Sequence, residues 1–171
     1  CPRWSPEMSM TPRKRPSGSM REYYRSVSGW DAANGKGIDV QGEVHGWFRM
    51  PKPMSYYADG SSGMGSNFPR NAPGMVRDAV SAAQAAGVDF TGHDMLGEGI
   101  VTALFVVHAG GGAEQTLSKD DIWSHKWVVP DGIDVGPGLQ VQTYLTVPED
   151  CNMGVCAHEW GHLAARWADY Y

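Results

Sequence analysis

The sequence has few cysteines, no excess of positive charge and no long hydrophobic run, and each absence excludes a class of protein. Its three cysteines are too few, and odd in number, for a disulfide framework. Its 14 Lys and Arg against 19 Asp and Glu give a net charge of −5, so no broad basic surface for a nucleic-acid backbone is expected. The longest strongly apolar stretch, residues 100–107, is far shorter than the roughly 20 residues of a membrane-spanning helix. We therefore expect a protein that binds neither nucleic acid nor membranes.

The three cysteines leave the redox compartment of the protein open. Cys151 and Cys156 lie close enough in the sequence to form a small-loop disulfide if the compartment is oxidising. Cys1 is then unpaired, or it bonds to one of these two. The sequence decides neither pairing.

Length and composition favour one folded domain preceded by an extended leader. With 171 residues, 42% of them hydrophobic, the chain can bury one core. Residues 1–19 contain four prolines and a short basic run, without apolar periodicity, which is typical of an extended segment. We therefore assign residues 1–19 to a leader and residues 20–171 to the domain.

Apolar periodicity and turn residues predict a mixed sheet with helices packed on it, which is an α+β fold. The clearest helix is the alanine-rich segment that begins at Pro73 and stops at Gly87. The uninterrupted apolar run at 100–107 predicts a central strand that is buried on both faces. The other expected elements are a helix over 20–28, a strand pair over 38–50, strands over 121–129 and 139–147 joined by a turn-rich connection at 130–138, and a last helix over 155–171.

The last predicted helix carries the strongest chemical signal, the spacing His158-Glu159-x-x-His162. Residues i and i+4 share one face of an α-helix, so both imidazoles can bind one zinc ion. Glu159 lies roughly 100° around the helix from His158, where its carboxylate reaches a water on the ion rather than the ion itself. Zinc lowers the pKa of such a water to about 7 and polarises a peptide carbonyl, which makes Glu159 the candidate general base for peptide hydrolysis.

The same short motif can also occur by chance on a solvated helix face. Apolar residues flank it on both sides, among them Trp160, Leu163 and Trp167. This setting indicates that the two histidines are partly buried, and buried imidazoles need partners. On this ground the motif favours a zinc site over a chance match.

A catalytic zinc site needs a third protein ligand and keeps its fourth position open. Asp169 is the nearest candidate, because it lies seven residues past His162 and returns to the same face if the helix continues. An exposed aspartate near a frayed helix end is an equally good interpretation. The other histidines are candidates by position only, and a structural role is favoured for each: His45, His93, His108 and His125.

Several segments beyond the helix motif resemble the M6 family of secreted metallopeptidases, the immune inhibitor A type. They are DVQGEVHGWFRMP, VRDAV, ALFVVHAGGGAE, DIWSHKW, TVPED and GVCAHEWGH with the trailing DYY. The resemblance implies a zincin-like fold, in which a twisted mixed sheet packs with an active-site helix beneath a cleft, and an endopeptidase that acts outside the cell. In it, His158 and His162 match the zinc-binding histidines and Glu159 matches the catalytic glutamate.

Two departures from the family pattern concern metal ligands. The family continues H-x-x-G-x-x-D, whereas here Ala165 stands in place of the glycine, and Asp169, the implied third zinc ligand, comes one residue late. The segment FTGHDMLGEGIVTAL resembles one that carries an acidic calcium loop, and Asp94 and Glu98 are the remaining candidate calcium ligands. Calcium takes roughly six to eight oxygen ligands, so loss or weak binding of that ion is favoured.

The resemblance also implies that the chain is the N-terminal portion of a catalytic domain, completed by a C-terminal portion or by a second polypeptide. We therefore predict a secreted zinc endopeptidase that acts on protein or peptide substrates. The alternative is a catalytically inactive zincin-fold binding or structural module, which Ala165, the late Asp169 and the thinned acidic loop favour. A zinc hydrolase of other carbonyl substrates is a third interpretation that the motif alone allows.

Overall fold

The computed structural model describes residues 19–168, which form two compact units that divide between Gly46 and Trp47. All of the predicted leader except Ser19 lies outside the described residues, so its extended character stays a prediction. Within residues 19–168, no helix is both long and apolar enough to cross a membrane.

The first unit contains helix α1 (Met20–Ser28), as the sequence predicts. Ser19 caps the helix: its hydroxyl accepts a hydrogen bond from the Glu22 N–H, and the Glu22 carboxylate accepts one from the Ser19 N–H. Gly29 ends the helix with φ 63°, a left-handed conformation that glycine adopts without steric cost.

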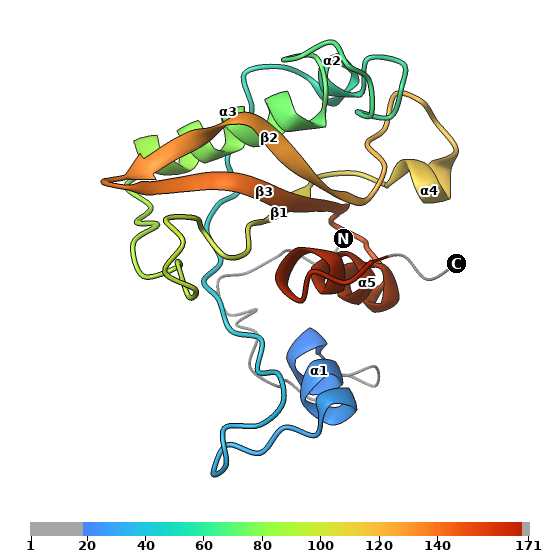
Figure 1. Ribbon diagram of the computed structural model, residues 1–171. Helices are drawn as coiled ribbons and strands as arrows, with labels where there is room; N and C mark the ends of the chain where they lie inside the picture. The colour runs from blue at the N-terminus through green and yellow to red at the C-terminus, as the bar shows by residue number, and fades with distance from the viewer. Residues whose placement is uncertain (1–18, 169–171) are drawn as a thin grey trace. The chain divides into compact units, whose positions relative to one another are not determined.

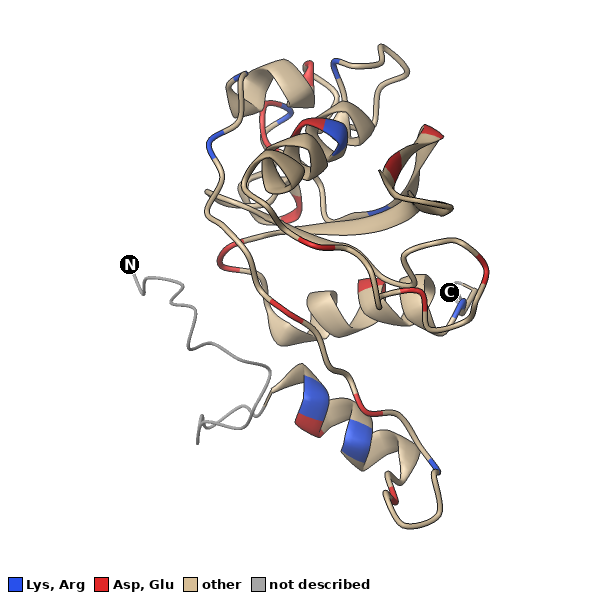
Figure 2. Cartoon of the chain, turned by 90° about the vertical axis from the view of Figure 1, so that its left-hand side faces the viewer, with Lys and Arg blue, Asp and Glu red and all other residues tan. Residues whose placement is uncertain are grey.

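Asp39 ties the segment that follows α1 back to the helix. Its carboxylate accepts hydrogen bonds from Arg21 Nε and Arg25 Nε, both at 2.6 Å, and only 6% of its side chain is exposed. The guanidinium groups, that of Arg21 first, hold the pKa of Asp39 well below its usual range. Figure 2 shows charges of both signs on α1, so the helix has no uniformly basic surface. The two arginines contribute a contact that stabilises the fold.

Residues 38–50 are all described and form no strand, so the predicted strand pair is wrong. An alternating pattern produces a strand only where a neighbouring strand and a core are available to it. Here Val44 is 45% exposed and Trp47 is 51% exposed, while Gly46 turns the backbone with φ 114°. The segment is therefore an irregular connection between the two units.

The second unit is built on a sheet of β1 (Phe105–His108), β2 (His125–Gly136) and β3 (Leu139–Pro148), in the order β1-β3-β2. β1 pairs with β3 in parallel and β2 pairs with β3 antiparallel, which confirms the predicted mixed sheet and the α+β class. The register places Val106 and His125 opposite Thr146. Because side chains alternate along a strand, Thr146 faces one side of the sheet and Leu145 faces the other.

The predicted strand at 100–107 needs correction. Only its last residues enter β1, which lies at an edge of the described sheet, while β3 is central. Val101 and Leu104 still pack in the core, from irregular backbone. The predicted burial on both faces is also wrong, because Phe105, Val106 and Val107 are only partly buried. Hydrophobicity indicates contact with a core, but it carries no information about strand order.

The predicted turn at 130–138 is also wrong, because most of it belongs to β2. The pairing of β2 with β3 shifts between Val128 and Ile133, and Asp131 and Gly132 have φ values of 62° and 66° there. These turn-forming residues therefore make a bulge inside a long strand, and the chain reverses only after Gly136.

Four helices belong to the described part of the second unit: α2 (Met54–Ala58), α3 (Ala72–Ala85), α4 (Ala113–Thr116) and α5 (Met153–Ala164). α3 and α5 lie on opposite faces of the sheet (Figure 1). Val76 of α3 packs in one core with Tyr144, and Leu163 of α5 packs in another with Leu145. The second of these cores fixes α5, which carries the histidine motif, against β3.

α3 confirms the predicted alanine-rich helix. Pro73 lies in its first turn, and the Asn71 side chain caps it by accepting a hydrogen bond from the Gly74 N–H at 3.1 Å. Gly74 itself is buried where α3 approaches the backbone of Pro69. Glycine is needed at this position because the approach leaves no room for a side chain.

Gly74→Ala is expected to destabilise the fold by about 3 kcal/mol. A Cβ atom at this position would overlap the Pro69 carbonyl oxygen, a backbone atom that moves only if the loop moves. Gly154→Ala in α5 is the control, since a Cβ there meets nothing within 4 Å and alanine stabilises a helix by up to about 1 kcal/mol. Urea unfolding measures both variants, and equal midpoints would contradict the close approach at Gly74.

Candidate metal centre

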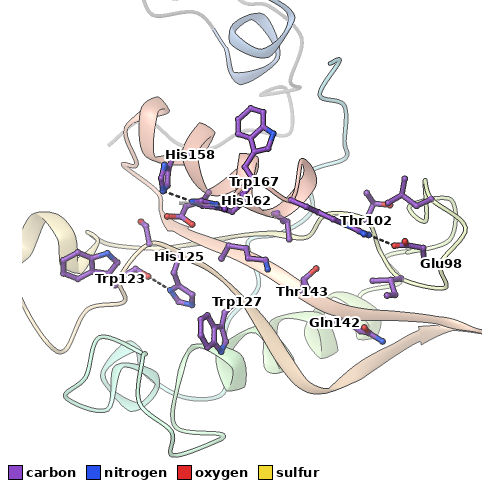
Figure 3. Close-up of a pocket in the computed structure, with 18 of the residues that line it drawn as sticks. Glu98, Thr102, Trp123, His125, Trp127, Gln142, Thr143, His158, His162 and Trp167 are labelled. Carbon is purple, nitrogen blue, oxygen red and sulfur yellow. Dashed lines mark hydrogen bonds and ion pairs between the residues drawn. The ribbon is translucent and has the colours of Figure 1, made fainter. Parts of the chain in front are cut away.

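The two histidines of the motif converge on one point beside α5 (Figure 3). His158 Nε2 and His162 Nε2 are 2.9 Å apart, and their rings cross at 86°. Two imidazole nitrogens that bind one tetrahedral zinc ion, each at about 2.0–2.1 Å, lie roughly 3.3 Å from each other. The observed pair needs only a small opening to reach that separation, so these two side chains fit zinc.

A backbone carbonyl fixes the tautomer of His162. Nδ1 of His162 lies 2.7 Å from the Trp167 carbonyl oxygen. Because a carbonyl oxygen only accepts, Nδ1 carries the proton and donates it, and Nε2 keeps its lone pair. This is the form in which histidine binds a metal, and a carbonyl on the other ring nitrogen is the usual outer support of such a ligand.

α5 ends at Ala164, so the predicted continuation of the helix to residue 171 is wrong. Ala165 keeps right-handed backbone angles, and Arg166 makes the turn with φ 54°. The Trp167 N–H then donates to the Gly161 carbonyl at 3.3 Å and closes the helix end. The turn thus comes one residue later than a glycine at position 165 would place it, and Asp169 follows it by three residues, as in the G-x-x-D spacing of the family pattern.

The histidine pair faces a cleft of about 740 Å³ that is lined by α5, by residues 123–127 and by the loop at 96–102. Figure 3 shows Trp123 and Trp127 across the cleft from the histidines. Glu159 lines the same cleft. His158 is exposed, so the expectation that both histidines are partly buried holds only for His162. Because the histidines line an open cleft, they are accessible from solvent.

No group of three or more His, Cys, Asp or Glu side chains within residues 19–168 is placed to hold a metal ion. His45, which contacts Glu43 at 3.1 Å in the first unit, therefore joins no such group, and neither do His93, His108 and His125. Asp169 lies outside the described residues, so its assignment as the third zinc ligand stays a prediction.

The two candidate calcium ligands, Asp94 and Glu98, bind different groups within the chain. The Asp94 carboxylate accepts hydrogen bonds from the backbone N–H groups of Gly99 at 2.8 Å and Glu98 at 3.0 Å, and these bonds lower its pKa. The Glu98 carboxylate pairs with Arg166 at 2.6 Å. Calcium binding by Asp94 and Glu98 stays a prediction, and here their oxygens serve contacts within the chain.

Cys151 and Cys156 are neighbours at the start of α5. Both are free thiols, and their sulfur atoms lie 2.8 Å apart, packed with Trp160 against the core that contains Leu163. Their disulfide in an oxidising compartment stays a prediction, and Cys1 lies outside the described residues.

Two further histidines are buried and neutral. His125 donates from Nδ1 to the Trp123 carbonyl and accepts at Nε2 from the Tyr144 hydroxyl at 2.9 Å. His108 donates from Nδ1 to the Ala109 carbonyl at 3.1 Å. Burial lowers the pKa of both histidines, and a backbone hydrogen bond and the Glu114 carboxylate raise it in part. Asp121 and Asp150 also raise the pKa of His108, whereas the neighbouring His108 lowers that of His125.

The free energy of unfolding is therefore expected to decrease as the pH falls below about 6.5, the ordinary pKa of histidine. With a pKa lowered in the folded state, each histidine binds fewer protons when folded than when unfolded, so its contribution is complete above that pH and is lost below it. Urea unfolding at pH 7.5, 6.5 and 5.5 measures this dependence for the wild type and for His125→Gln. A variant with the same slope as the wild type would contradict the role of His125.

The sequence did not reveal the residues that support His162 or face it across the cleft. Arg166 and Trp167 follow the motif directly, but their roles depend on where α5 ends. Trp123 and Trp127 fall on one face of a predicted strand by alternation. Nothing in the sequence indicates that this strand lies opposite α5.

Comparison with known proteins identifies a family and several relatives of this chain. The family described as "Immune inhibitor A peptidase M6, catalytic domain" matches residues 4–170. Immune inhibitor A of Bacillus thuringiensis subsp. alesti is 31% identical to the chain over 84% of the chain and 24% of its own length. Pre-pro-metalloprotease PrtV of Vibrio cholerae serotype O1 (strain M66-2) is 31% identical over 84% of the chain and 18% of its own length. The chain thus spans less than a quarter of each of these relatives.

Proposed function

Since this chain belongs to the immune inhibitor A family of M6 peptidases, we propose that it functions as a zinc-dependent endopeptidase. The observation that carries the proposal is the convergence of His158 Nε2 and His162 Nε2, 2.9 Å apart, at a cleft that Glu159 also lines. The name of PrtV describes that relative as a metalloprotease, which agrees with this chemistry.

Three side chains would hold the zinc ion: His158 and His162 through Nε2, and Asp169 through its carboxylate. The turn at Arg166 supports Asp169, because it restores the three-residue spacing between the left-handed residue and the aspartate. Zinc, when bound, supplies Lewis-acid polarisation of the scissile carbonyl and makes a water molecule acidic enough to react near pH 7.

Glu159 acts as the general acid and base in this proposal. Its carboxylate accepts the proton of the attacking water and returns it to the leaving amine, two tasks that one carboxylate can perform in sequence. The Trp167 carbonyl keeps His162 in its Nδ1–H tautomer throughout, so this imidazole does not compete with Glu159 for the proton.

The substrate is a protein or peptide in extended conformation. β2 pairs with β3 along one side, and no other described strand pairs with its second side, so a peptide can add to that edge through backbone hydrogen bonds. Residues 123–127, which lead into β2 and form its start, line the cleft opposite the histidines. We infer a secreted protein, in keeping with peptide hydrolysis outside the cell.

A catalytically inactive module is the second candidate. Ala165 in the glycine position of the family pattern favours it, together with the thinned acidic loop that carries Asp94 and Glu98. Such a module would bind substrates or partners with the cleft and hydrolyse nothing.

Zinc content and peptide hydrolysis of the 171-residue chain separate the two candidates. The peptidase predicts one zinc ion per chain and cleavage of an unstructured protein such as casein, with both lost on chelation and regained with zinc. A folded chain that takes up no zinc and cleaves nothing would support the inactive module.

A further inference from the structure

We propose that Glu98 is a positioning residue for the metal centre, and that it acts through Arg166 on the orientation of His162. The Glu98 carboxylate pairs with Arg166 at 2.6 Å, and Arg166 forms the turn that brings the Trp167 carbonyl to His162 Nδ1. The inference rests on the proposed zinc site and assigns to Glu98 a role other than calcium binding.

The loop that carries Glu98 is held in place by its own hydrogen bonds. Asp94 accepts from the N–H groups of Glu98 and Gly99, so its carboxylate closes the loop from within. Gly99 in turn is anchored to the start of β3, because its carbonyl accepts from the Gln140 N–H at 2.9 Å. The backbone that carries Glu98 is therefore held in place by hydrogen bonds.

Arg166 needs such a contact because of its backbone conformation. Its φ of 54° lies in the left-handed region, which costs free energy for any residue with a Cβ and which glycine adopts freely. At this turn the chain has arginine instead of glycine, and the ion pair with Glu98 offsets part of the cost. Both side chains are largely exposed, 65% for Arg166 and 43% for Glu98, so solvent screens the pair and its effect is modest.

A change in the turn at Arg166 affects His162 through the next residue, Trp167. Trp167 follows Arg166 directly, and its carbonyl accepts the His162 Nδ1–H at 2.7 Å. Loss of such an outer partner typically weakens metal binding by about 10- to 100-fold, since the ligand then samples the wrong tautomer and orientation. A variant that only loosens this partner is expected to produce a fraction of that loss.

Glu98→Gln tests the inference with two measurements. In the metal-free protein at pH 8, nitrogen chemical shifts of His162 report its tautomer, and the Nδ1–H fraction is expected to fall. The zinc dissociation constant, measured by competition with a chelator, is expected to increase about three- to fivefold. Asp120→Asn is the matched control, because it removes one negative charge from a residue that does not line the cleft.

Arg166→Gly separates the ion pair from the turn. Glycine accepts the left-handed conformation without the ion pair, so this variant is expected to keep the Nδ1–H tautomer and zinc affinity, and Glu98→Gln added to it should change neither. An unchanged tautomer in Glu98→Gln would overturn the inference, as would an equal effect of Glu98→Gln with and without Arg166. If the wild type binds no zinc, the proposed function is wrong, and the tautomer of the metal-free protein still decides whether Glu98 positions His162.

Discussion

Glu159→Gln is expected to reduce the rate of peptide hydrolysis by about 100- to 10,000-fold while leaving one zinc ion bound per chain. Glutamine matches glutamate in size, and its amide cannot accept a proton from water at neutral pH. The proposed ligands His158 and His162 are unchanged, so zinc affinity is expected to stay the same. The measurement is kcat/KM on a peptide substrate together with zinc content on the same preparation.

Loss of activity with retention of zinc is the result that identifies a general base. A variant that loses zinc as well as activity would show that Glu159 acts on the metal site rather than on the water. A variant that retains full activity would remove Glu159 from the mechanism. Glu149→Gln is the control, since this glutamate lies outside the cleft and accepts a hydrogen bond from the Gly110 N–H.

His158→Ala is expected to weaken zinc binding by more than about 100-fold, because a direct ligand contributes more than the outer partners whose loss costs up to that factor. His158 is exposed at the cleft, so its removal leaves no cavity in a core and the fold should persist. His45→Ala is the matched control: His45 lies in the first unit and faces Glu43. Chelator competition measures both variants, and equal zinc affinities would contradict the proposed pair.

The convergence of His158 and His162 was predicted from the sequence because its geometry is local, while their binding of a metal stays a prediction. Four residues separate His158 from His162, and one turn of helix brings the two rings together wherever the helix lies in the fold. The α3 helix was predicted for the same reason, from its proline start and its apolar stripe. In both cases the interactions that matter are between residues a few positions apart.

Features that depend on tertiary partners were not predicted. Residues 38–50 alternate like a strand and form none, and the apolar run at 100–107 contributes only an edge strand. The pairing of Glu98 with Arg166 joins residues far apart in the sequence, and it exists only because α5 ends at Ala164. Hydrophobicity and spacing indicate which secondary structure a segment can form. Strand order and ion pairs depend on which other segments pack against it in the fold.

The order of residues around His162 has a consequence for how the centre matures. The carbonyl that orients the His162 imidazole belongs to Trp167, which follows both histidines in the sequence. During synthesis, a ribosome therefore releases the two histidines before the atom that prepares one of them for an ion. Proteolytic cleavage between Ala164 and Trp167 would likewise leave both imidazole rings intact, but it would free the carbonyl that orients His162.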